Sequence, residues 1–262
     1  MNSIIIAACQ PIDIQEDIER SLKQIIDYSL ESESQNARMI CFPECFLQGY
    51  IVSERTHELA MNLTSIEFKQ ILEQLSHIKP ILIIGLIERE NNNTYNTAVV
   101  IKEGELLGSY RKFNLIGREN EVFKPGNTFP IFELDGIRFG INICNDLNFP
   151  DCAKAVSTQH ADLLVCPCNN MLRLENAEKW RNRHNEIRGE RCIETGLFLI
   201  SSDVTGEHDG RISYGPTAII NNEGVVVMQL PLMQPGLLIY EFSKNKRGIT
   251  NTCYGRVNVP QI

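Results

Sequence analysis

The chain has 262 residues, of which 43% are hydrophobic and 22% are charged, a composition typical of a globular protein that can bury a substantial core. The formal net charge of −8 argues against a nucleic-acid-binding or anionic-membrane-binding protein, and no apolar run approaches the ~18 residues that span a membrane. Nine cysteines, several inside apolar runs, and an N-terminus without a basic region favour a reducing, cytoplasmic location over secretion.

The first half of the chain alternates between buried strands and amphipathic helices. Its apolar runs and helically spaced apolar residues predict, in order, a strand at 4–9, a helix at 17–30, a strand at 37–42, a helix at 65–78 and a strand at 81–87. Two further runs, 97–101 and 105–110, flank Lys102-Glu103-Gly104 and predict a tight hairpin.

The second half opens with another hairpin and then returns to alternation. The pattern predicts, in order, strands at 129–134 and 137–143, a helix at 152–160, a strand at 161–166, a polar helix from about 175 to 195, a strand at 197–201 and a hairpin of 217–221 with 225–229. Gly196 is suited to end the polar helix. No linker or repeat interrupts the pattern, so we expect one domain over 1–262, with helices packed outside a mixed sheet system. The segment 243–262 is a tail, either a surface extension or an oligomer contact.

A structural metal is not expected. The pairs Cys41/Cys45 and Cys166/Cys168 lack the two-residue gap of a zinc knuckle, and the five histidines are scattered without a shared period.

Three reactive side chains, Glu44, Lys112 and Cys144, each follow a hydrophobic run. A carboxylate, an ammonium and a thiol are what a cysteine hydrolase needs as base, oxyanion stabiliser and nucleophile. Cys144 lies where a strand runs into a turn before a helix, which exposes a thiol and favours its thiolate. The apolar neighbours of Glu44 would raise its pKa toward that of a general base. Each residue also has an ordinary structural explanation, as a core cysteine, a capping glutamate or a solvated lysine.

The segments around these residues resemble a known family. Glu44 in CFPECFLQGY, Lys112 in SYRKFNL and Cys144 in GINICNDLNFPD are similar, in order and spacing, to the three signature segments of the nitrilase-like carbon–nitrogen hydrolase family, in an amidase-type member. FKPGN at 123–127 and RCIETGLFLISSD at 191–203 resemble flanking segments of that family. The resemblance extends over most of the chain, from residue 5 to about residue 242.

The resemblance implies a fold and a mechanism. The fold would be α/β, a four-layer α-β-β-α sandwich with two mixed β-sheets, usually paired into a homodimer or a larger homo-oligomer. The mechanism would need no metal and no cofactor. Glu44 would take the thiol proton and later activate water, Cys144 would attack the amide carbon, and Lys112 with the backbone N–H of Asn145 would stabilise the oxyanion. Glu119 is the candidate for a second, accessory glutamate, with Glu121 as a close rival.

The resemblance also suggests where substrate would bind. Asn145 stands where members often carry an aromatic residue, which implies a more polar or differently shaped pocket. Asn169 and Asn170 in PCNNM could hydrogen-bond an amide or a carboxylate, and Tyr214 in ISYGPTAII is a further candidate. The charged connection between these segments contains Trp180, Arg181, Arg183 and Arg188. Charged helical residues are mostly exposed, which favours a solvated helix face there.

The leading functional hypothesis is an amidase that cleaves a small ω-amide, an N-carbamoyl compound or a similar C–N compound and releases ammonia or an amine. The Asn145-Asp146 pair argues mildly against a nitrilase, whose members usually carry Trp-Glu there. A catalytically silent binding or scaffold protein on the same fold, or an acyltransferase, are the alternatives. The expected partner is thus a small-molecule amide, with no nucleic acid and no membrane.

Overall fold

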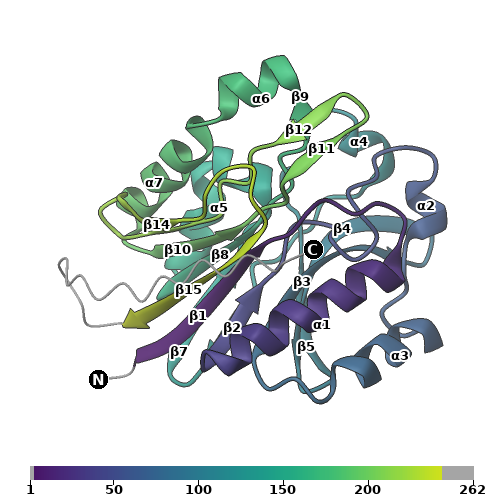
Figure 1. The fold of residues 1–262 in the computed structure, drawn as a ribbon, viewed down its shortest axis with the longest axis horizontal. Coiled ribbons are helices and arrows are strands. Elements are labelled where there is room, and N and C mark those ends of the chain that lie inside the picture. The colour runs from purple at the N-terminus through teal and green to yellow at the C-terminus, as the bar shows by residue number, and fades with distance from the viewer. Residues whose placement is uncertain (1–2, 244–262) are drawn as a thin grey trace.

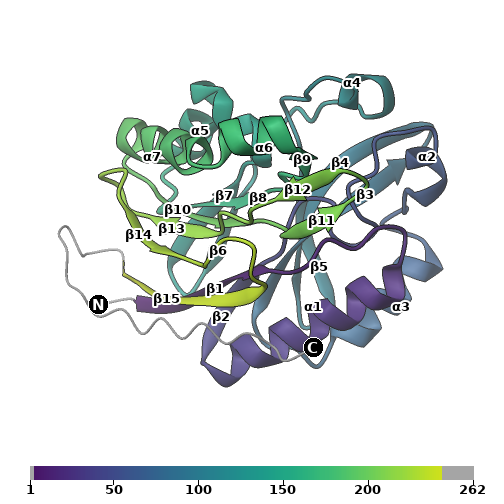
Figure 2. The same cartoon turned by 45° about the horizontal axis from the view of Figure 1, so that its top comes forward.

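Two six-stranded β-sheets pack face to face, and helices cover the outer face of each, so that the structure has four layers (Figures 1 and 2). The structure is a computed structural model that describes residues 3–243. The predicted α-β-β-α sandwich with two mixed sheets is confirmed. The predicted C-terminal tail lies, after Ser243, outside the described residues.

The first sheet has the strand order β15-β1-β2-β3-β4-β5. Strands β1, β2 and β3 run parallel, and the other three are antiparallel to their neighbours. Helices α1 and α3 cover the outer face of this sheet and share a hydrophobic core with it. The bounds are β1 (Ser3–Gln10), α1 (Ile18–Ser34), β2 (Ala37–Cys41), α3 (Ile66–Leu75), β3 (Ile81–Glu90), β4 (Asn93–Lys102), β5 (Glu105–Arg111) and β15 (Gly236–Ser243).

The second sheet has the order β14-β13-β10-β8-β7-β6 and repeats the same plan. Strands β7, β8 and β10 run parallel, and antiparallel strands extend both edges. Helices α5 and α7 pack on its outer face (Figure 2). The bounds are β6 (Ile131–Leu134), β7 (Ile137–Ile141), α5 (Pro150–Ser157), β8 (Leu163–Pro167), α7 (Arg183–Thr195), β10 (Phe198–Ser202), β13 (Ala218–Ile220) and β14 (Val226–Gln229).

Short elements complete the chain. A small sheet has the order β11-β12-β9, and four short helices lie in the connections. The bounds are α2 (Thr56–Leu59), α4 (Glu119–Val122), the 3-10 helix η1 (Cys144–Asn148), β9 (Leu172–Arg173), α6 (Leu174–Trp180), β11 (Gly206–His208) and β12 (Arg211–Ser213).

Strand β1 shows why the central strands read as continuous apolar runs. Successive side chains of a strand point to opposite faces. Ile6 and Ala8 pack between the two sheets, whereas Ala7 and Cys9 pack against the helices outside the first sheet. Both faces are therefore buried, and no polar alternation is possible.

Local signals set several helix ends. Asp17 caps α1 by accepting the Arg20 N–H at 3.0 Å, and Ser65 caps α3 by accepting the Phe68 N–H. Gly196 ends α7 in the left-handed conformation at φ 73°, as predicted. The single polar helix expected from about 175 to 195 is wrong, because the chain breaks at residues 181–182 into α6 and α7.

Polar and reactive side chains gather where strands of both sheets end. The residues that follow β1, β2, β5, β7, β8 and β10 include Asp13, Glu44, Lys112, Cys144, Asn169 and Asp203, respectively. In α/β sheets, ligands bind at the carboxyl ends of parallel strands. The two sheets meet there directly, because the Glu44 N–H donates to the Cys168 carbonyl at 3.1 Å. Among the described residues, no helix combines the length and hydropathy needed to cross a membrane.

Candidate active site

A buried ion triplet forms the centre of the candidate site. The Lys112 Nζ donates to Glu44 Oε1 at 2.7 Å and to Glu119 Oε1 at 2.8 Å, and all three side chains are 1% exposed. Asn96 on β4 donates to Glu44 Oε1 at 2.7 Å, and the Tyr50 hydroxyl donates to Glu119 Oε1 at 2.8 Å. A buried cation with two carboxylates and further donors satisfies the requirement that buried charges be paired.

The triplet decides between the two accessory glutamates that the sequence left open. Glu119 is buried beside Lys112, and its Oε2 also accepts the Ile116 N–H at 2.8 Å. Glu121 instead lies on the surface at 66% exposure, 3.6 Å from Arg118. Glu119 therefore belongs to the candidate site and Glu121 does not.

A glycine on β3 makes room for the turn that carries Glu44. A Cβ on Gly85 would lie 2.2 Å from the Pro43 carbonyl oxygen and 2.8 Å from the Glu44 Cα. Real Cβ atoms do not approach so closely, and both neighbours are backbone. Glycine at position 85 thus allows the Glu44 turn to pack directly on the neighbouring strand.

The electrostatics of the triplet follow from burial and proximity. Burial raises the pKa of the Glu44 carboxyl above its ordinary value, and the Lys112 charge opposes that rise only in part. Burial by itself would lower the pKa of Lys112, but the acidic groups around it, of which Glu44 has the largest effect, together raise the pKa well above the ordinary value. Lys112 thus keeps its positive charge, and Glu44 has the affinity for a proton that a base requires.

Cys144 lies on a strained turn at the end of β7. It has a positive φ of 43°, which is costly for a residue with a Cβ, and it begins the 3-10 helix η1. Asp146 holds this turn, because its carboxylate accepts the Ile143 N–H at 2.9 Å, the Asn114 N–H at 2.7 Å and the Tyr110 hydroxyl at 2.8 Å. The strand-to-turn position predicted for Cys144 is confirmed.

The surroundings of the Cys144 thiol favour its protonated form. A hydrogen bond with Cys168, then burial, then the charge of Glu44 raise its pKa well above the ordinary value, and Lys112 opposes them. These effects work against the thiolate that the turn is expected to favour. The five-residue η1 offers only a small dipole, which these larger effects exceed. A nucleophile in this state needs a base to remove its proton.

A cavity of about 360 Å³ opens in front of the thiol. Its lining combines three groups already described, five asparagines and a mostly apolar wall: Lys112, Cys144, Cys168, Asn145, Asn148, Asn169, Asn170, Asn176, Tyr50, Ile116, Leu147, Met171, Leu172, Trp180, His184, Ile187, Arg188 and Arg211. The Trp180 and His184 rings stack with centroids 5.5 Å apart, and burial lowers the pKa of His184 to about 3. The imidazole is therefore neutral at physiological pH.

Of the five residues predicted to bind substrate, Asn145, Asn169 and Asn170 line this cavity, whereas the accessory Glu119 is buried beside Lys112. Asn145 bonds to the backbone of Asn114 through its side chain, at 3.1 Å. The Oδ1 of Asn170 lies 3.8 Å from the Cys144 sulfur. Asn169 lines the same cavity, and its backbone N–H donates to Glu44 Oε2 at 3.0 Å.

Tyr214 is also absent from the cavity lining. Its ring lies under the Arg181 guanidinium at 4.8 Å, and its hydroxyl donates to Glu178. Both of these partners are about half exposed. Tyr214 thus takes part in a cluster beside α6 rather than in the floor of the site.

Arg188 is buried, so the expectation of a solvated helix face is wrong for this residue. Its side chain is 3% exposed and donates to Asn185 Oδ1, Ser201 Oγ and the Pro216 carbonyl at 2.8, 3.2 and 2.8 Å. It also lies 3.0 Å from the Cys168 sulfur and 3.6 Å from Asp203 Oδ2. Arg181 and Arg183 are exposed, as expected.

Several residues that complete the site were not identified from the sequence. Asn96 lies in strand β4 among several other polar residues, so nothing in the pattern marked it. Asp203 directly follows the strand β10, and a polar residue at the end of a buried strand is the signal that could have identified it. Among residues 3–243, no three His, Cys, Asp or Glu side chains are arranged to hold a metal ion.

Comparisons with known proteins identify the family of the chain. The chain matches the carbon-nitrogen hydrolase family model over residues 5–249. It is 28% identical over 249 residues to a glutamine-dependent NAD(+) synthetase of Acinetobacter baylyi, covering 92% of this chain but only 44% of that protein. It is 29% identical over 237 residues to a probable nitrilase of Schizosaccharomyces pombe, covering 86% of this chain and 83% of that one.

Solved structures show the same fold. A mutant of the amidase from Nesterenkonia sp. AN1, with acrylamide added to its active-site cysteine, superposes with a TM-score of 0.80 at 23% identity. The match covers 92% of this chain and 93% of the amidase. The chain spans less than half of the NAD(+) synthetase that it resembles, so that likeness concerns one part of a larger protein. The match over residues 5–249 covers most of the sequence and confirms the predicted family. The chain therefore belongs to the carbon–nitrogen hydrolase family of enzymes, within the nitrilase superfamily.

Proposed function

We propose that the protein hydrolyses the C–N bond of a small amide through a thioester on Cys144. The observation that carries the proposal is the placement of Cys144 on a strained turn in a cavity that it shares with Lys112. Lys112 is itself in contact with the buried carboxylate of Glu44. This arrangement offers a protonated thiol, a group able to accept its proton and a fixed positive charge.

In the proposed first step, Glu44 accepts the Cys144 proton and the sulfur attacks the amide carbon. The carbonyl oxygen becomes an oxyanion, which Lys112 and the backbone N–H of Asn145 stabilise. The C–N bond then breaks, and the nitrogen takes the proton from Glu44 and leaves as ammonia or an amine. In the second step, Glu44 removes a proton from water and the hydroxide attacks the thioester carbon. The C–S bond then breaks, the acid leaves, and the sulfur takes the proton back from Glu44.

The cavity favours an uncharged reacting end and an apolar acyl chain. Lys112 is already paired with two carboxylates and Arg188 with Asp203, whereas His184 is neutral. Arg211 on the lining is exposed, and its guanidinium lies 3.4 Å from the Met171 carbonyl. This cation could pair with a carboxylate at the far end of the substrate. Small ω-amides, whose members include glutamine, therefore lead the candidate substrates.

Ammonia release over a panel of neutral amides, ω-amides, N-carbamoyl compounds and nitriles tests the proposal. We expect release from at least one amide, loss of that activity in Cys144→Ala, and retention in the matched control Cys192→Ala, whose thiol lies on α7 and is buried in the core. Full activity in Cys144→Ala would contradict the mechanism. Release from nitriles alone would favour a nitrilase, whereas a hydroxamate formed from an amide and added hydroxylamine would support the thioester on Cys144. A silent panel would favour a binding protein.

A further inference from the structure

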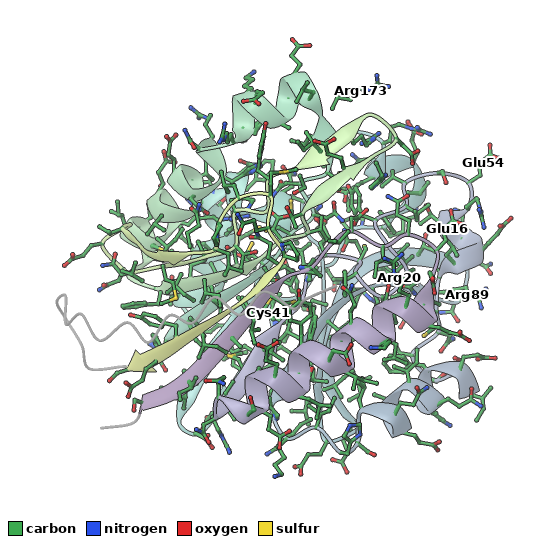
Figure 3. All side chains as sticks on the ribbon, in the orientation of Figure 1. Glu16, Arg20, Cys41, Glu54, Arg89 and Arg173 are labelled. Carbon is green, nitrogen blue, oxygen red and sulfur yellow. The ribbon has the colours of Figure 1, made fainter. Side chains whose placement is uncertain are left out.

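A second cavity lies near the candidate active site, at the end of strand β1. It has a volume of about 290 Å³, and its lining comes from the β1–α1 connection, the start of α1 and the region of β11, and includes Asp13, Gln15, Arg20, His208 and Asp209. Arg20 and Glu16, labelled in Figure 3, mark this end of α1. One lining residue, Asp13, connects this cavity to the other one.

Asp13 is a buried carboxylate with a donor on each oxygen. Its side chain is 2% exposed, and its Oδ1 accepts the Asn169 Nδ2–H at 3.0 Å. Its Oδ2 accepts from His208 Nε2 at 2.7 Å and from Gln15 Nε2 at 3.2 Å. Burial raises the pKa of Asp13, and His208 and Asn169 oppose that rise. An acceptor that is so well satisfied fixes the side chains around it.

Asn169 occupies the position between the two cavities. Its Nδ2 donates to Asp13, its Oδ1 accepts the Met171 N–H at 3.2 Å, and its backbone N–H donates to Glu44 Oε2 at 3.0 Å. These contacts fix both its side chain and its backbone. They direct the side chain toward Asp13 and Met171 rather than toward a substrate.

We propose that Asp13, held by His208, is a positioning residue for the general base, acting by fixing Asn169 so that its backbone N–H stays on Glu44 Oε2. The inference rests on the proposed role of Glu44. Because Glu44 Oε1 is engaged by Lys112 and Asn96, the orientation of Oε2 depends on the Asn169 contact.

Loss of this contact has a predictable direction. A hydrogen bond to a carboxylate stabilises its charged form, so weakening the bond raises the pKa of Glu44 further. The other titratable groups near Glu44 lie on segments other than the one that carries Asp13. They are Lys112, Glu119, Tyr50, Cys45 and Cys144. The acidic limb of the kcat/KM profile, where Glu44 becomes protonated, should therefore report on Asp13.

The test compares Asp13→Ala, Asn169→Ala and the double variant on an amide that the wild type hydrolyses. We expect Asp13→Ala to lower kcat about tenfold with little change in KM, and to move the acidic limb up by about one pH unit, as for one lost hydrogen bond to a charged group. The double variant should be no slower than Asn169→Ala, because Asp13 acts through Asn169. Asp13→Asn, which keeps an acceptor oxygen for Asn169, should recover most of kcat.

Control variants separate the possible failures. Asp209→Ala should behave as the wild type, because this 86% exposed residue contacts His208 from the solvent side. Thermal unfolding shows whether Asp13→Ala folds. If it does not, His208→Ala and the double variant His208→Ala with Asn169→Ala take the place of Asp13→Ala and its double variant in the comparison. A wild-type kcat and pH profile, or effects of Asp13 and Asn169 that multiply, would overturn the inference. Full activity in Glu44→Gln would instead refute the proposed function.

Discussion

Replacing Arg188 by Met tests whether the buried Arg188–Asp203 pair holds the floor of the site together. Met fills much of the space of the arginine stem but leaves Asp203, which is fully buried, without its cation. Removing one partner of a buried ion pair costs about 3–5 kcal/mol, because the remaining charge is uncompensated. For a chain of this size, that corresponds to a fall in Tm of roughly 6–20 °C.

Arg191→Met is a matched control on the same helix. Arg191 is also buried, but its partners Glu190 and Glu194 are 60% and 37% exposed and remain hydrated when the cation is lost. We expect a cost of about 1 kcal/mol for this variant. Denaturant unfolding of both variants provides the comparison, and equal destabilisation by the two substitutions would refute the reasoning.

The loss of folding stability in Arg188→Met should depend on pH, and this dependence gives a second readout. Burial raises the pKa of Asp203 in the native protein, and Arg188 opposes that rise. Without Arg188 the pKa of Asp203 in the native protein rises further, so the unpaired charge destabilises the fold at pH values above the ordinary Asp pKa of about 3.9. The difference in stability between Arg188→Met and the wild type should therefore become smaller as the pH falls through the raised pKa. Adding Asp203→Asn should also recover part of the lost stability, and a further loss would contradict this account.

Three further outcomes follow from the same structure. Glu119→Gln should lower kcat by at least tenfold, the loss expected for one buried charged hydrogen bond to Lys112, whereas the exposed Glu121→Gln should leave the rate unchanged in the same assay. Burial raises the pKa of Glu44, and the charge of Glu119 adds to that rise, so the wild-type kcat/KM should increase with pH around a midpoint above the ordinary Glu pKa of about 4.3. In Glu119→Gln the midpoint of this increase should move to lower pH. An unchanged midpoint would contradict the assignment of Glu44 as the base. Iodoacetamide should label Cys144 before the other seven described cysteines, which are all buried. The labelling rate of Cys144 should rise with pH, because its pKa is raised above the ordinary value and only the thiolate reacts. Uniform labelling of the cysteines, measured by mass spectrometry, would count against an accessible nucleophile.

The sequence was most informative where a local pattern has one physical meaning. Apolar runs buried on both faces predicted the central strands, and the strand ends predicted where Glu44, Lys112 and Cys144 would lie. Their convergence could not be derived from periodicity, because it depends on how two sheets stack. The resemblance to a known family supplied that part of the prediction.

Long-range pairings account for most of what the sequence missed. The rule that helical arginines are exposed failed for Arg188, because its partner Asp203 is distant in sequence and on another element. The state of the Cys144 thiol was also missed, since it depends on Cys168 and on burial rather than on the turn alone. The break between α6 and α7 carries no glycine or proline that would have marked it.

The two sheets come from different parts of the chain, so the reactive groups of the site could be supplied by two separate fragments. Residues up to Arg111 supply β1 to β5, residues from Ile131 to Gln229 supply the second sheet, and β15 then returns to pair with β1. Glu44 and Lys112 thus come from one part of the chain, and Cys144 comes from the other. Two fragments separated between β5 and β6 would each carry an incomplete set of reactive groups. Recovery of hydrolysis on mixing them would therefore measure docking of the sheets, which makes this junction a natural site for a split-enzyme reporter.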